Sequence, residues 1–172
     1  MNTVFERILA GTQTILPQHF LSRIVYKVMR CETKWVKNTQ INLISRIAGI
    51  NADEALSPDP ADYASFNAWF TRALKPGVRT FELDEDAFIS PCDGRIAETG
   101  SLEQNRILQA KGKTYTLQNL LANDPVCEAL LDGYFSTIYL SPRDYHRIHM
   151  PVSGKLVRMI HVPGRLFSVA PY

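Results

Sequence analysis

Two of the chain's four histidines lie three residues apart in the segment Ser141–Pro151, which reads Ser-Pro-Arg-Asp-Tyr-His-Arg-Ile-His-Met-Pro. An imidazole titrates near neutral pH, so His146 and His149 can each accept or donate a proton. A carboxylate such as that of Asp144 can fix the tautomer of a neighbouring imidazole. The segment therefore predicts proton-transfer chemistry, although a histidine in a loop between strands can also be simply solvated.

Two further turn-like segments carry polar groups. Ser90-Pro-Cys-Asp-Gly places Asp93 in a turn defined by proline and glycine, and the segment Val162–Ser168 places Arg165 in another. Aspartate and glycine are ordinary turn residues. Taken alone, Asp93 therefore favours a structural turn over a functional site.

A metal site is a weaker interpretation of the same region. No two of the histidines have the i, i+4 spacing of a helical zinc motif, so we expect no metal. The residues that could ligate zinc are His146, His149, His161, Cys92 and Asp144.

Composition sets broad limits. A chain of 172 residues, 45% of them hydrophobic, can build one domain with a real core. Its three cysteines are widely spaced and form no Cys-x-x-Cys pair, which favours reduced thiols in a cytoplasmic setting. No segment is typical of a secretory signal or of a membrane span. We expect a protein that is neither secreted nor transmembrane.

Basic charge is concentrated in the N-terminal part. Residues 1–50 contain seven Lys and Arg against two acidic residues, net +5, whereas residues 51–172 contain twelve against fifteen, net −3. Apolar residues recur at helical spacing over Val4–Leu9 and Phe20–Met29, and basic residues intervene in the second run. These amphipathic helices suit an anionic membrane surface. An ordinary helix packed on the domain explains the pattern equally well, and nucleic acid is a weaker interpretation because basic and aromatic residues do not interleave.

The elements that must position the polar groups follow this region. Helical spacing predicts helices over residues 41–50 and 65–74, and the aromatic residues of the second are expected in the core. We expect Arg72, Lys75 and Arg79 to be solvated charges, with a phosphate contact as the alternative.

After Pro76 the pattern changes to short, β-branched or alternating runs. Strands are predicted at residues 88–90, 95–97, 106–110, 134–140 and 154–162. A helical pattern over 117–131 is interrupted at Asn123-Asp-Pro. The order predicts an α+β fold, in which N-terminal amphipathic helices precede a β-rich, mostly antiparallel body. We expect residues 1–50 to form a membrane-associating segment and residues 51–172 a partial catalytic domain.

Four motifs in this order resemble bacterial phosphatidylserine decarboxylase. They are Phe66-x-x-Trp-Phe-x-Arg-x-Leu-Lys-Pro-x-x-Arg79, Ser90-Pro-x-Asp-Gly, Tyr139-Leu-Ser-Pro-Arg-Asp-Tyr-His-Arg-Ile-His-Met-Pro and Val162-Pro-Gly-x-Leu-Phe-Ser-Val. The histidine string is highly specific and the Ser-Pro-x-Asp-Gly motif moderately so. The resemblance extends from the N-terminus to Tyr172.

The resemblance implies a pyruvoyl enzyme that processes itself. In that family the serine of a Leu-Gly-Ser-Thr motif attacks its own preceding carbonyl, and elimination of the ester leaves a pyruvoyl group on a new N-terminus. Asp93 and His149 match the aspartate and the base of the triad, and His146 matches a residue that acts in the later decarboxylation. The pyruvoyl ketone forms a Schiff base with the amine of phosphatidylserine and acts as the electron sink, which yields phosphatidylethanolamine and CO2.

The resemblance also implies partners and a location. The substrate is phosphatidylserine, and the enzyme is peripheral on an anionic membrane surface, at the cytoplasmic side of the cell membrane. The pyruvoyl-bearing smaller chain of the processed enzyme is a further partner. A homodimer is left open, and no nucleic acid is expected.

The sequence departs from the family pattern at the serine. No Leu-Gly-Ser-Thr occurs, and the single Gly-Ser pair, Gly100-Ser101, lies in an unrelated context. We therefore expect a fragment of a proenzyme, incomplete at its C-terminus and inactive alone, whose sheet exposes an edge and apolar surface and favours association. A non-catalytic lipid- or partner-binding module and a metal-dependent hydrolase using the histidine pair are the alternatives.

Overall fold

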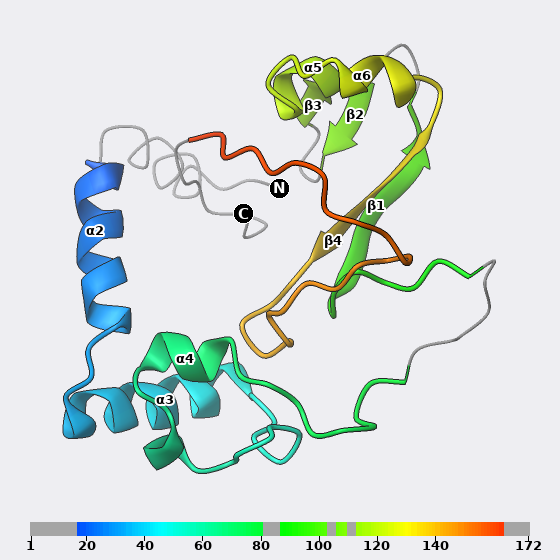
Figure 1. The fold of residues 1–172 in the computed structure, drawn as a ribbon. Helices are drawn as coiled ribbons and strands as arrows, with labels where there is room; N and C mark the ends of the chain where they lie inside the picture. Colours follow the sequence, from blue (N-terminus) through cyan, green and yellow to red (C-terminus); the bar gives the residue numbers. More distant parts are fainter. Residues whose placement is uncertain (1–16, 81–86, 103–105, 110–112, 164–172) are drawn as a thin grey trace, which may run out of the picture.

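The computed structural model describes residues 17–80, 87–102, 106–109 and 113–163. Helices fill the first part of the chain and two antiparallel strand pairs lie in the second part (Figure 1). The predicted α+β class is confirmed. The predicted helix over Val4–Leu9 and the turn residues beyond Pro163 lie outside the described residues.

The two long helices differ in how they are packed. Helix α2 (Gln18–Met29) has no buried residue, whereas α3 (Lys34–Ala48) buries Lys37 and Ile41. Helix α3 ends at Gly49, whose left-handed φ of 70° a side chain would disfavour. Helix α3 therefore belongs to the core, while α2 extends away from it and packs against it at its last residue, Met29 (Figure 1).

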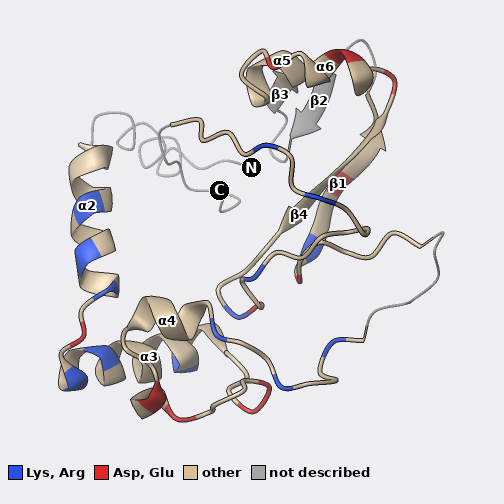
Figure 2. Cartoon of the chain, in the orientation of Figure 1, with Lys and Arg blue, Asp and Glu red and all other residues tan. Residues whose placement is uncertain are grey.

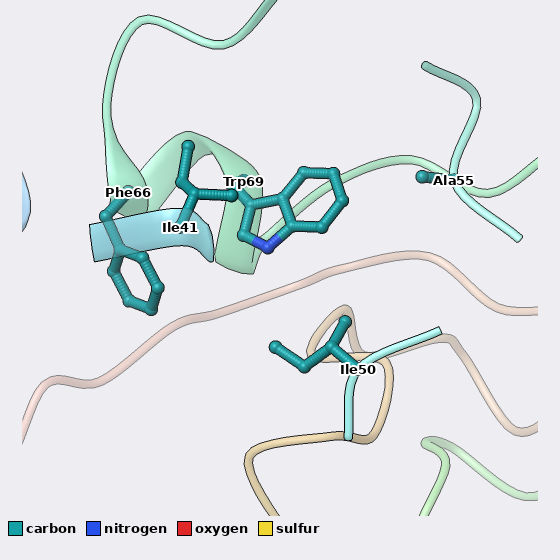
Figure 3. Packing of buried hydrophobic residues seen from close by; sticks show 5 residues of the cluster. All are labelled: Ile41, Ile50, Ala55, Phe66 and Trp69. Atoms are coloured by element: carbon teal, nitrogen blue, oxygen red, sulfur yellow. The ribbon is translucent and has the colours of Figure 1, made fainter. Parts of the chain in front are cut away.

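The first hydrophobic cluster joins α3 to the short helix α4 (Phe66–Phe70). Helix α4 begins at Ser65, whose hydroxyl accepts a hydrogen bond from the Ala68 amide, as an N-cap should. Trp69 fills the centre and donates its indole N–H to Ser45 Oγ at 3.1 Å. The buried members of the cluster are Ile41, Ile50, Ala55, Phe66 and Trp69 (Figure 3). This core joins residues of the predicted segment 1–50 to residues of the predicted domain 51–172.

Helix α4 is shorter than the predicted helix over residues 65–74. After Phe70 the chain turns back and pairs with the segment around Ala55, which forms an isolated bridge with Leu74. The Leu56 amide donates to Ala73 O at 2.8 Å, and the Lys75 amide donates to Glu54 O at 2.9 Å. These tertiary bonds replace further helical turns, and the 3-10 helix η1 (Pro60–Asp62) lies in the intervening loop.

Two strand pairs form the β part. Strand β1 (Arg95–Ser101) pairs antiparallel with β4 (Tyr134–Tyr139), with a register shift between Ile96 and Glu98. Strand β2 (Arg106–Gln109) pairs antiparallel with β3 (Lys113–Thr116). Three of the predicted strands, at 95–97, 106–110 and 134–140, are therefore confirmed in outline.

The predicted interruption of the helical pattern over 117–131 is confirmed. The structure has two short helices there, α5 (Leu117–Leu120) and α6 (Val126–Ala129), separated by the Asn123-Asp-Pro turn. Leu117 and Cys127 pack with Leu102 in a second buried cluster. This cluster packs at the end of the β1–β4 pair where Ser101 pairs with Tyr134.

Two predicted strands do not form. Residues 87–90 and 154–163 have no regular secondary structure. Residues 154–163 are exposed throughout, so their alternating pattern has no described ladder partner on which to form a strand. The prediction of strands at 88–90 and 154–162 was wrong for this structure because a strand requires a partner as well as a pattern.

The two tryptophans provide a matched test of the helical core. Trp69 is 1% exposed and Trp35 is 74% exposed. We expect Trp69→Ala to lower the free energy of unfolding by about 3–5 kcal/mol, because it leaves a cavity between α3 and α4. Trp35→Ala should change it by less than about 0.5 kcal/mol. Urea unfolding followed by circular dichroism measures both, and equal losses would show that the described core is wrong.

Candidate active site

Two backbone hydrogen bonds bring the Asp93 turn and the histidine segment together. The Ile89 amide donates to Pro151 O at 3.1 Å, and the His149 amide donates to Pro91 O at 2.6 Å. The partners run in opposite directions, as in an antiparallel pair. Residues 89–91 and residues 149–151 therefore lie side by side, although neither segment forms a strand.

The turn itself depends on a glycine. Gly94 follows Asp93 with a φ of 137° and leads into β1. A Cβ at this position would lie 2.6 Å from the Tyr139 carbonyl oxygen of β4, which is closer than real Cβ atoms approach. Glycine thus allows Asp93 to sit where β1 and β4 meet.

Arg79 binds the Asp93 carboxylate with two of its nitrogens. Its Nε donates to Oδ1 at 3.1 Å and to Oδ2 at 3.2 Å, and its Nη2 donates to Oδ2 at 2.6 Å. The same Nη2 donates to Glu54 Oε2 at 3.0 Å, and Nη1 donates to the Val78 carbonyl at 3.1 Å. Every nitrogen of this guanidinium therefore donates a hydrogen bond. Charge-assisted hydrogen bonds such as those to the two carboxylates are stronger than hydrogen bonds between neutral groups.

Asp93 is held in its ionised form. The side-chain hydrogen bonds from Arg79 are the largest cause that lowers the pKa of Asp93, and partial burial opposes them. The Arg79 charge, the Tyr145 backbone amide and the charge of His149 lower it further. The same hydrogen bonds from Asp93 are the main cause that raises the pKa of Arg79. At neutral pH the turn therefore presents a carboxylate that can only accept hydrogen bonds.

His149 lies against a buried aromatic ring. Tyr145 is buried, and its ring stacks on the imidazole of His149 with 5.6 Å between centroids and 30° between planes. The Tyr145 backbone amide and the His149 charge both lower the pKa of Asp93. Asp93 and His149 therefore share one electrostatic environment.

His146 has different surroundings. Its ring lies 4.0 Å from the Phe70 ring of α4, between centroids, and its Nδ1 lies 2.8 Å from the Asp144 carbonyl oxygen. A carbonyl oxygen can only accept, so Nδ1 carries the hydrogen and Nε2 is the nitrogen that can take or give a proton. The backbone of Asp144 thus fixes this tautomer, while its carboxylate accepts from the Ser141 amide at 2.6 Å.

The arginines of the Phe66–Arg79 motif are not the solvated charges that the sequence predicts. Arg72 is 3% exposed and lies over the Trp69 ring, 5.3 Å from its centroid, while Arg79 is paired with Asp93. Lys75 alone of the three is exposed. The spacing of the motif carried no signal for these partners, because Asp93 is 14 residues from Arg79.

The end of α4 is joined to the histidine segment by a further bond. Arg147 Nε donates to the Thr71 carbonyl at 2.8 Å. Together with the Phe70 contact, this bond fixes the segment between the helical core and the strand pair. The site therefore combines residues from five separate parts of the chain, which are Glu54, residues 70–72, Arg79, residues 89–94 and residues 144–149.

The described residues contain no group of three His, Cys, Asp or Glu side chains close enough to hold a metal ion. Burial and the neighbouring Asp93 charge raise the pKa of the Cys92 thiol, which favours its protonated form over the thiolate that binds metals. The arrangement is suited to acid–base chemistry by a carboxylate and two imidazoles.

Comparison with known proteins extends this description. Residues 66–172 match the family model described as phosphatidylserine decarboxylase, and residues 9–47 match a model described as PSD. Phosphatidylserine decarboxylase proenzymes are similar over most of the chain, with 52% identity in Alkalilimnicola ehrlichii, 45% in Azotobacter vinelandii and 46% in Stenotrophomonas maltophilia. The alignments cover 99%, 95% and 91% of this chain, and 59%, 58% and 56% of those relatives. The chain thus spans less than two thirds of their length.

The Asp93 ion pair predicts a pH-dependent stability. Because the folded-state pKa of Asp93 is lowered, its stabilisation is present above its ordinary pKa of 3.8 and is lost as the pH falls through the folded value. We expect Asp93→Asn to cost roughly 1 kcal/mol at pH 7, since solvent reaches both partners, and almost nothing below about pH 3. Urea unfolding across this range measures the difference. The exposed Asp53→Asn is the control, and a cost for Asp93→Asn that is constant with pH would contradict the ion pair.

Proposed function

The chain belongs to the phosphatidylserine decarboxylase family, and on that premise we propose that it supplies the acid–base residues of an enzyme that converts phosphatidylserine to phosphatidylethanolamine and CO2. The observation that carries the proposal is the backbone pairing of residues 89–91 with residues 149–151, which sets His149 beside the Asp93 turn. Both segments lie within the region that matches the family model.

In this proposal Asp93 and His149 act in self-cleavage. A neutral His149 accepts the proton of a serine hydroxyl as the oxygen attacks the preceding carbonyl carbon, while the ionised Asp93 stabilises the resulting imidazolium. The Arg79 pairing supports this role, because it keeps Asp93 a carboxylate at neutral pH. The serine would come from the rest of the whole protein, since no serine of this chain follows a Leu-Gly pair.

His146 acts at the later stage. Its Nδ1 donates to the Asp144 carbonyl, so Nε2, once it has been protonated to give the imidazolium, is the nitrogen that would deliver a proton to the carbon that has lost CO2. The contact with Phe70 keeps one face of the ring from water. Two histidines with different neighbours can thus serve two different proton transfers.

The described residues fit a pyruvoyl group, because the chemistry of such a group needs a proton donor beside it and Nε2 of His146 could take up a proton and then donate it, while Nδ1 stays bonded to the Asp144 carbonyl. When bound, the pyruvoyl ketone supplies the electron sink for decarboxylation. Asp93, His149 and His146 are this chain's contribution to the site.

The pyruvoyl-bearing smaller chain is the proposed partner of the exposed segment 154–163. Leu156, Val157 and Met159 are 74%, 89% and 85% exposed, so this segment presents a row of apolar side chains. Contiguous apolar surface of this kind marks an interaction site. A strand from the smaller chain would give the segment the ladder partner that the described residues do not provide.

Helix α2 is the proposed membrane contact. Its apolar residues are exposed, among them Phe20, Ile24 and Val28, and basic side chains lie along the same helix (Figure 2). Such a helix lies in the membrane interface when its apolar face enters the lipid and its basic residues meet anionic head groups. Among the described residues, no helix is both long enough and apolar enough to cross a bilayer. We propose that α2 associates peripherally with the membrane, on its cytoplasmic side.

The division of labour between the histidines can be tested in a fusion. The 172-residue chain alone should neither cleave itself nor release CO2 from phosphatidylserine, because it contains no Leu-Gly-Ser-Thr. Fused to the C-terminal part of the Alkalilimnicola ehrlichii relative that follows the aligned region, it should do both. His149→Ala and Asp93→Ala should slow self-cleavage by roughly 10²- to 10⁴-fold. His146→Ala should leave cleavage intact and abolish CO2 release.

Gel electrophoresis of the fusion over time measures cleavage, and trapping of CO2 from carboxyl-labelled phosphatidylserine measures turnover. The exposed His19→Ala, on α2 and outside the proposed acid–base residues, is the matched control for the cleavage assay. CO2 release by the 172-residue chain alone, or equal effects of His146→Ala and His149→Ala on cleavage, would contradict the assignment.

The membrane proposal is tested with vesicles. Arg23→Gln with Lys27→Gln removes two charges from α2 and should weaken binding to phosphatidylserine-containing vesicles by about 30-fold, at about 1 kcal/mol per charge. The control is Lys75→Gln with Lys155→Gln, which removes the same charge from exposed positions outside α2. Cosedimentation measures both, and equal losses would remove the specific role of α2. Deleting residues 1–50 would not test α2 alone, because it would also remove Ile41 from the first hydrophobic cluster.

A further inference from the structure

We infer that Arg79 is a positioning residue for the Asp93 carboxylate, and that Glu54 fixes Arg79 in that role. The inference rests on the proposed function, because it assigns Asp93 the task of orienting His149. Neither Arg79 nor Glu54 belongs to the proposed triad. Both act on the chemistry only through the carboxylate.

The geometry of Arg79 leaves it little freedom. Its guanidinium is bound on three sides, by Asp93, by Glu54 and by the Val78 carbonyl, with distances from 2.6 to 3.2 Å. A planar group with its donors on three different acceptors cannot rotate without breaking several bonds at once. The carboxylate that it binds is thereby held in one orientation.

Glu54 connects this arrangement to the helical core. Its backbone carbonyl accepts from the Lys75 amide at 2.9 Å, next to the bridge between Ala55 and Leu74. Ala55 is fully buried in the first hydrophobic cluster. Arg79 therefore links Asp93 to the packed part of the chain, across 25 residues of sequence from Glu54.

The number of acceptor positions on Asp93 explains why this matters. An ionised carboxylate offers about four lone-pair positions, and two nitrogens of Arg79 bond to its two oxygens. The positions that remain leave room for one imidazole N–H. Without Arg79 the carboxylate could turn or take up a proton, and a protonated Asp93 could no longer accept with both oxygens.

A salt bridge near the surface usually contributes little to stability. A purely structural role for Arg79 would therefore change the unfolding free energy and the pKa of Asp93, which are linked, and leave cleavage unaffected. A positioning role changes the rate of cleavage as well. The groups that face Asp93 are Arg79 and, through it, Glu54, together with Cys92 and His149.

The first experiment measures the ionisation of Asp93 in the 172-residue chain by carbon-13 carboxylate NMR. Arg79→Gln should raise the pKa of Asp93, because it removes both the hydrogen bonds and the charge. Arg79→Lys keeps the charge but cannot form the two-nitrogen contact, so its pKa should fall between those of the wild type and Arg79→Gln. The matched control is Arg158→Gln, which breaks another Arg–Asp pair, that of Arg158 with Asp124, and should leave Asp93 unaffected.

The second experiment measures self-cleavage of the fusion described above. Arg79→Gln should slow cleavage by about 10- to 100-fold, as the loss of a residue that orients a catalytic group does. It should also move the low-pH limb of the cleavage rate profile to higher pH, because the pKa of Asp93 rises. Arg79→Lys should restore only part of the rate.

The outcomes separate the two proposals. If Arg79→Gln leaves the cleavage profile unchanged, the positioning role is wrong while the proposed function stands, whether or not the pKa of Asp93 shifts. If Arg79→Gln does not fold, Arg79→Lys decides, and a wild-type rate and pKa in that variant overturns the role. If the wild-type fusion does not cleave, the proposed function fails, and an unchanged pKa in Arg79→Gln would then overturn the inference as well.

Discussion

An ionised carboxylate in a partly buried turn is the constraint on which the site depends. Asp93 is kept ionised by Arg79, and Arg79 is kept in place by Glu54 at the edge of the helical core. A carboxylate without such a partner would tend to neutralise as it is buried. The helices that pack around Trp69 thus help to position the residues proposed for proton transfer in the second part of the chain.

The two histidines are positioned by different kinds of contact. His149 is held through its backbone, by the bond to Pro91, and its ring stacks on Tyr145. His146 is held through its ring, by Phe70 and by the carbonyl that fixes its tautomer. Residues that lie three apart in a loop would otherwise share one environment. Separate neighbours are what allow separate roles, and the pairing of segments that are not strands provides them.

The sequence predicted well those elements that depend on local pattern. Helix α2, the second half of α3, the interruption at Asn123-Asp-Pro and strands β1 and β4 follow from periodicity and from proline and glycine, whereas the start of α3 at Lys34 was not predicted. Strands at 88–90 and 154–162 were predicted from equally good patterns, yet a strand also needs a partner that periodicity cannot identify. Arg72 and Arg79 were misjudged for a related reason, because their burial and pairing arise from Trp69 and from the distant Asp93.

The importance of Asp93 could not come from its local sequence, since an Asp-Gly turn is common. It came from the resemblance of four motifs taken in order, and the structure adds the physical reason that two of those motifs lie together. Amide hydrogen exchange in the 172-residue chain tests this arrangement most directly. The amide of His149 should exchange much more slowly than those of its exposed neighbours Ile148 and Met150, because it donates to the Pro91 carbonyl. Equal exchange at all three positions would contradict the central claim that the histidine segment is held against the Asp93 turn.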